Sequence, residues 1–94
     1  MNEFIIAVFS LRTSTMQFNT LLGRNGVKSL IIETPKSASA SCGISVRFDV
    51  KNLERAKEIL QHSGIKNFVR FYRVNFFQNQ TRLTPIYWFY ILMC

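Results

Sequence analysis

The apolar run FIIAVF, at residues 4–9, most limits the folds open to this chain. Every side chain in it is aliphatic or aromatic, whereas a strand with one solvated face alternates apolar and polar residues. A strand with the continuous pattern is buried on both faces or lies in the centre of a sheet. We therefore predict a central strand over residues 4–10.

A helix pattern follows this strand. Within residues 13–26 the side chains of Phe18, Leu21 and Leu22 fall at helical spacing. Ser and Thr residues at the start of this range are suitable N-caps, and Gly26 is suitable to end the helix. The sequence thus predicts a first helix over residues 13–26.

Two more strands and a second helix are predicted before residue 65. Residues 27–33 read as a strand, and residues 43–49 alternate apolar with polar side chains, as in a sheet with one covered face. Asp49 is a suitable cap for a helix over residues 50–64, whose apolar side chains form one stripe and whose last residue is Gly64.

Residues 67–74 form the fourth predicted strand, which gives the order βαββαβ. Two split βαβ units with right-handed crossovers make a ferredoxin-like sandwich, an α+β fold with a four-stranded antiparallel sheet and both helices on one face. In this topology the first two strands are parallel. The loop over residues 34–43 should therefore lie at the same end of the sheet as the start of the first helix. We predict one such domain over residues 1–74.

The C-terminal extension, residues 75–94, is almost wholly apolar from Pro85 onward. The apolar stretch that begins at Pro85 is too short to span a bilayer, which needs about 20 apolar residues, so no membrane association is expected. It could add a fifth strand to the sheet edge, form a homo-oligomer through Tyr87, Trp88 and Phe89, or be disordered. The sequence leaves these alternatives open.

Composition restricts the function classes. Twelve Lys and Arg residues stand against five acidic residues, for a net charge of +7, which favours a negatively charged partner. The basic residues are scattered and form no Lys/Arg-rich run, so a solvated basic surface is favoured over a dedicated nucleic-acid patch. The N-terminal residues lack the basic start and cleavage site of a signal peptide. We expect a cytoplasmic protein with reduced thiols.

Cys42 lies near the end of the loop TPKSASASCG, residues 34–43. If this loop meets the first helix as predicted, the helix dipole and its free N–H groups would stabilise a thiolate by about 0.3–1 kcal/mol. Arg12 and Lys36 would add positive charge. A small buried cysteine with no chemical role is the alternative. The spacing of Cys42 and Cys94 is not that of metal ligands. Cys94 could act as a resolving thiol for Cys42, but this is disfavoured because a disulfide needs a fixed geometry that a C-terminal cysteine lacks.

The segment FSLRTSTMQFNTLLGRNGVKSLIIETPKSASASCGISVRF resembles the selenium/sulfur carrier-like proteins, which are short bacterial domains. The shared features are a strand, a helix, a turn whose residues resemble Thr-Pro-Arg, a serine cluster, and Cys-Gly before the next strand. The motif residues in register are Thr34, Pro35, Lys36, Ser41, Cys42 and Gly43. The chain departs from the family at Met16 or Gln17, where a small residue is usual, and at Lys36, where Arg is usual and supplies a planar fork.

The resemblance implies that Cys42 accepts sulfur or selenium as a persulfide or perselenide. The donor would be a protein such as a cysteine desulfurase, and a second protein would accept the atom. This is a carrier rather than a turnover enzyme, and its chemistry requires no cofactor and no metal. The residues implied to shape the loop or favour the anion are Arg12, Thr34, Pro35, Lys36, Ser39, Ser41 and Gly43.

Two other function classes stay open. In FVRFYRV, residues 68–74, aromatic side chains alternate with Arg70 and Arg73, as on a sheet that stacks RNA bases. The same aromatic side chains could equally face a core, and no RNP-like pattern occurs, so nucleic acid is disfavoured as a partner. The second alternative is a protein-interaction module that contains a structural cysteine.

Overall fold

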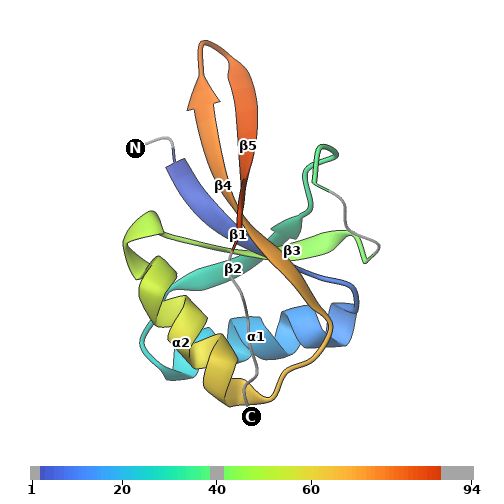
Figure 1. Ribbon diagram of the computed structural model, residues 1–94, viewed down its shortest axis with the longest axis vertical. Helices are drawn as coiled ribbons and strands as arrows, with labels where there is room; N and C mark the ends of the chain where they lie inside the picture. The colour runs from blue at the N-terminus through green and yellow to red at the C-terminus, as the bar shows by residue number, and fades with distance from the viewer. Residues whose placement is uncertain (1–2, 39–41, 88–94) are drawn as a thin grey trace.

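The computed structural model describes residues 3–38 and 42–87, which form an α+β domain with two helices (Figure 1). Its elements, in chain order, are β1 (Glu3–Phe9), α1 (Arg12–Arg24), β2 (Ser29–Glu33), β3 (Ile44–Phe48), the 3-10 turn η1 (Val50–Asn52), α2 (Leu53–Ser63), β4 (Phe68–Phe77) and β5 (Gln80–Ile86). The predicted α+β class is confirmed.

All five strands belong to one antiparallel sheet of order β2-β3-β1-β4-β5. The first four have the neighbour order of a ferredoxin-like sheet. The predicted total of four strands is wrong, because β5 pairs with β4 from Phe71 opposite Ile86 to Phe77 opposite Gln80. A tight turn joins these two strands, with Gln78 and Asn79 at positive φ.

The predicted central strand is confirmed. β1 pairs with β3 on one side and β4 on the other, and its side chains from Phe4 to Phe9 are all buried. Burial on both faces explains why this segment shows no alternation of apolar and polar residues.

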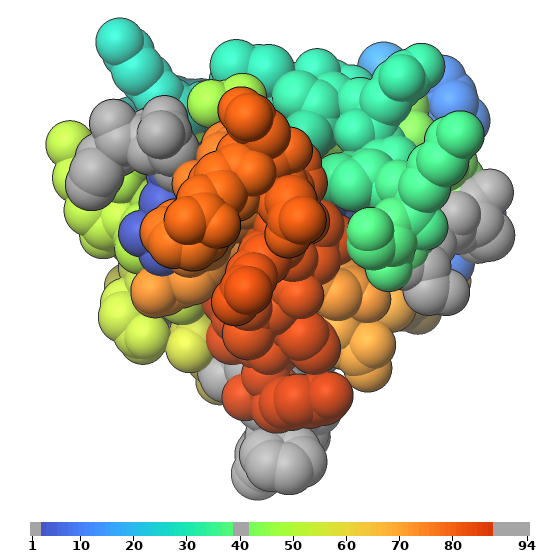
Figure 2. Space-filling view, turned by 90° about the horizontal axis from the view of Figure 1, so that it is seen from above, coloured from blue at the N-terminus to red at the C-terminus, as the bar shows by residue number. Residues whose placement is uncertain are grey.

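A hydrophobic cluster lies on each face of the sheet. On the helix side, Phe18 and Leu22 of α1 and Ala56 and Leu60 of α2 pack against strand residues that include Phe9. The second cluster, on the opposite face, contains Phe4, Ile6, Val8, Ala38, Tyr72 and Val74, with Ile32 and Leu83 packed against it. Figure 2 shows the β4–β5 hairpin, orange to red, running across the molecule beside the green residues that follow β2.

The helix ends partly follow the predictions. Asp49 accepts a hydrogen bond from the Lys51 N–H at the start of η1, and Gly64 ends α2 with φ 75°. The predicted Ser/Thr cap of α1 is wrong, because the N-cap is Leu11, which makes no side-chain cap bond. Ser14 and Thr15 instead lie buried in the first turns of this helix.

The described part of the C-terminal region contains the end of β4 and the whole of β5. β4 continues to Phe77, past the domain boundary predicted after Val74. Tyr87 is 79% exposed, whereas Trp88 and Phe89, predicted as oligomer contacts, lie outside the described residues, as does Cys94. Among the helices described, none is long and apolar enough to cross a membrane.

Candidate functional site

The sheet topology brings Cys42 to the start of α1. Because β1 and β2 are both antiparallel to β3, they run in the same direction. The β2–β3 loop and the β1–α1 junction therefore share one end of the sheet. The Arg12 guanidinium donates a hydrogen bond to the carbonyl oxygen of Cys42 at 3.2 Å, and the Cys42 Sγ lies 3.0 Å from the carbonyl oxygen of Phe9. The predicted meeting of loop and helix is present.

The sulfur of Cys42 is surrounded chiefly by hydrogen-bond acceptors. Its thiol donates to the Phe9 carbonyl at 3.0 Å and lies 3.4 Å from the Ile44 carbonyl. Cys42 is half-buried. A neutral thiol suits these contacts because its S–H can donate, whereas two carbonyl oxygens face a thiolate with their negative ends.

Thr15 is the residue near the sulfur that the sequence reasoning did not assign to the site. Its side chain is fully buried, and its Oγ1 lies 3.7 Å from the Cys42 Sγ. The hydroxyl donates to the Leu11 carbonyl at 3.1 Å, and it could rotate to donate to an ionised sulfur. The sequence could have pointed to Thr15, because it lies one turn inside the helix that follows β1 and that meets the Cys42 loop.

Thr34 and Gly43 close the base of the loop. The Thr34 N–H donates to the Gly43 carbonyl at 2.9 Å, and the Thr34 hydroxyl lies 2.6 Å from the hydroxyl of buried Ser45. Gly43 has φ +80°, a conformation that side chains other than glycine rarely adopt. These contacts hold the two ends of the loop together, and neither residue is shown bonding the sulfur.

None of the remaining predicted site residues that the structure describes makes a hydrogen bond to the Cys42 sulfur. Pro35 accepts a hydrogen bond from the Ala38 N–H at 3.0 Å, which forms a turn after β2. Arg12 contacts the backbone of Cys42 rather than its sulfur. Lys36 is exposed and makes no hydrogen bond or ion pair with the residues that the structure describes. Ser39 and Ser41 lie outside those residues.

The aromatic residues behind the RNA alternative are engaged in packing. Phe71 is fully buried in the helix-side cluster, where Phe68 packs against it with a ring-centroid distance of 4.9 Å. Tyr72 is buried in the second cluster. These rings are not available for base stacking. Within residues 3–38 and 42–87, no group of three His, Cys, Asp or Glu side chains is arranged to hold a metal ion.

Together, the fold and this site define a small α+β domain with a half-buried thiol at a strand–helix junction. A family model described as "Putative Se/S carrier protein-like" matches residues 4–68, and the chain belongs to this family. The resemblance in the sequence is thereby confirmed. The searches of curated proteins and of solved structures found no match.

Proposed function

We propose that this protein carries sulfur or selenium on Cys42 as a persulfide or perselenide. The observation that supports the proposal most directly is the position of the Cys42 Sγ at the β1–α1 junction, half-buried and 3.7 Å from the Thr15 hydroxyl. The family match supports the carrying of sulfur or selenium, because the family is described as Se/S carrier protein-like.

Loading begins when Cys42 releases to solvent the proton that it donates to the Phe9 carbonyl. The thiolate then attacks the outer sulfur or selenium of a persulfide or perselenide on the donor protein. A bond forms between that atom and the Cys42 Sγ, and its bond to the donor's sulfur breaks. The electron pair leaves with the donor's thiolate, so no external oxidant or reductant is needed. Attack by an acceptor thiolate on the carried atom delivers it in the same way.

The residues around Cys42 have separate parts in this scheme. Thr15 supplies a hydroxyl donor for the ionised sulfur, and Arg12 holds the Cys42 backbone against the start of α1. Thr34, Pro35 and Gly43 set the shape of the loop. Lys36, Ser39 and Ser41 complete the loop through which a donor and an acceptor approach.

The partners follow from the chemistry of the step. The donor is a protein that bears a persulfide or perselenide, such as a cysteine desulfurase, and the acceptor is a second protein with a free nucleophile. A cytoplasmic location belongs to the same proposal, because loading requires Cys42 to be a free thiol and that compartment keeps thiols reduced. The protein acts as a carrier and not as a turnover enzyme.

Intact mass spectrometry after incubation with a cysteine desulfurase and cysteine tests the proposal. Wild type and Cys94→Ser should each gain the mass of one sulfur atom, and Cys42→Ser should gain none. Selenocysteine in place of cysteine shows whether selenium is carried as well. The proposal is overturned if none of the proteins gains mass, or if Cys42→Ser is loaded as fully as Cys94→Ser.

A further inference from the structure

A cleft lies at the end of the sheet opposite Cys42. It is bordered by the start of β1, the start of β2 and the end of β3, and its volume is about 760 Å³. The seven residues of β1 separate the two ends of the sheet by about 20 Å at 3.3 Å per residue. This volume is within the usual range for sites that bind small molecules.

Three basic side chains line this cleft, from Lys28, Arg47 and Lys51. None of them forms an ion pair with a carboxylate among the residues that the structure describes. The guanidinium of Arg47 lies 3.9 Å from the centre of the Phe4 ring, which supports one face of the guanidinium plane. The cleft therefore holds positive charge that the protein itself does not neutralise by direct pairing.

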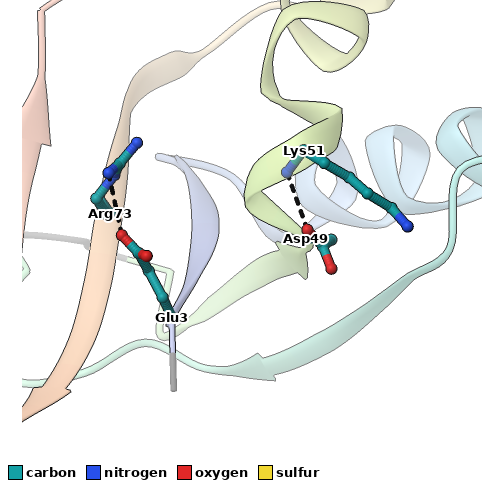
Figure 3. A network of polar contacts seen from close by, with 4 residues as sticks. All are labelled: Glu3, Asp49, Lys51 and Arg73. Atoms are coloured by element: carbon teal, nitrogen blue, oxygen red, sulfur yellow. Dashed lines mark hydrogen bonds and ion pairs between the residues drawn. The ribbon is translucent and has the colours of Figure 1, made fainter. Parts of the chain in front are cut away.

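The two carboxylates that line the same cleft are engaged with other groups. Glu3 accepts a hydrogen bond from Arg73 of β4 at 3.0 Å, and Asp49 accepts one from the backbone N–H of Lys51 at 2.9 Å. Figure 3 shows both contacts, and it shows the Lys51 side chain extending away from the Asp49 carboxylate. Within the part of the chain that the structure describes, neither carboxylate forms an ion pair with Lys28, Arg47 or Lys51.

We propose that this cleft binds an extended oligophosphate, such as the phosphate chain of a nucleoside triphosphate. Lysine ammonium groups bind phosphate as point charges, and a guanidinium can bind two phosphate oxygens at once. Single-stranded RNA fits less well, because its recognition uses exposed aromatic rings. Here Phe48 is only 3% exposed and the Phe4 ring is covered by Arg47. The proposal is independent of the chemistry at Cys42.

Calorimetric titration with inorganic tripolyphosphate and with ATP, at fixed ionic strength, tests the site. Lys28→Gln and Lys51→Gln should each weaken binding several-fold, and the double variant about tenfold or more, because each removes a charge-assisted contact. Lys66→Gln is the matched control. Lys66 is an exposed lysine just before β4, at the Cys42 end of the sheet, and its loss should leave the affinity unchanged.

The outcomes separate this site from diffuse surface charge. Equal weakening by Lys66→Gln would mean that the net positive charge of the protein attracts the anion without a site, and undetectable binding to wild type would also overturn the proposal. So would a single-stranded RNA oligonucleotide that binds more tightly than ATP and is weakened by the same two variants. Cys42→Ser should bind both phosphate ligands as wild type does, so failure here is distinct from failure of sulfur loading.

Discussion

At Cys42 two electrostatic effects oppose each other. The N-terminus of α1 favours a sulfur anion by about 0.3–1 kcal/mol. Ionisation also removes the S–H donor to the Phe9 carbonyl, and an ordinary hydrogen bond contributes about 0.5–1.5 kcal/mol. A hydrogen bond to a charged group contributes about 1.5–3 kcal/mol. The Thr15 hydroxyl lies 3.7 Å from the Cys42 Sγ and can donate such a bond to this sulfur.

Replacement of Thr15 by valine tests the role of this hydroxyl, because valine keeps the branched shape and removes the donor. We expect Thr15→Val to slow alkylation of Cys42 by iodoacetamide about tenfold, since losing a hydrogen bond of about 1.5 kcal/mol to the reacting sulfur corresponds to roughly that factor in rate. The rate is measured in a Cys94→Ser background. Thr15→Ser restores a hydroxyl and should react nearly as fast as the parent. Equal rates for the valine and serine variants would contradict the role given to this hydroxyl.

The Thr34–Ser45 pair is a separate test at the base of the loop. Ser45 is fully buried, and its hydroxyl lies 2.6 Å from that of Thr34. Thr34→Val should lower the free energy of unfolding by about 1–3 kcal/mol, because it leaves a buried hydroxyl without its partner. Adding Ser45→Ala should recover part of that loss. Urea unfolding of the single and double variants measures both values, and strictly additive losses would show that the two hydroxyls are not coupled.

At the scale of elements, local patterns in the sequence predict most strands and both helices. Apolar spacing predicts α1 and α2, and alternation of apolar and polar residues predicts β3. The expectation that only one face of β3 is covered is wrong at Ser45, which is fully buried on the polar face. The sequence leaves β5 open, because it is an edge strand with mixed polar residues and Pro85, and its formation depends on pairing with β4. The Cys42 position follows from the topology. Its carbonyl contacts do not, because they depend on atomic positions in three separate segments.

Two glycines in different backbone conformations should respond oppositely to alanine. Gly64 ends α2 with φ +75°, so Gly64→Ala should destabilise the protein by about 1 kcal/mol. Gly23 lies inside α1, with nothing within 4 Å of the position of an added Cβ. Gly23→Ala should stabilise by about 0.5–1 kcal/mol, because alanine loses less backbone entropy in a helix. Thermal unfolding monitored by circular dichroism compares the two, and shifts of the same sign would contradict this assignment.

At the scale of the whole molecule, the second cluster makes the β4–β5 hairpin part of the packed structure. Leu83 of β5 packs against this cluster, on the face opposite the helices. A truncation after Val74 would remove the whole of β5 and the last residues of β4 along with any C-terminal contact. A loss of function in such a truncated chain would therefore not identify a partner-binding tail.

Leu83→Ala measures this contribution directly. We expect a loss of about 1–2 kcal/mol in the free energy of unfolding, below the cost at a fully buried leucine because Leu83 is only partly buried. Leu30 is the matched control, since it also lies in an edge strand but is 52% exposed. Leu30→Ala should change stability by at most about 0.5 kcal/mol. Equal losses from the two variants, measured by urea unfolding, would show that β5 adds no specific packing.

The double burial of β1 also has a consequence during synthesis. This strand leaves the ribosome before its partners, and it pairs only with residues 45–48 and 68–75. At about 5–20 residues per second, the interval before β4 is translated lasts several seconds. Until β3 is translated this apolar segment has no strand beside it, and until β4 is translated one of its two edges stays unpaired. During that time the exposed segment from Phe4 to Phe9 is a binding site for cellular factors that shield apolar peptides.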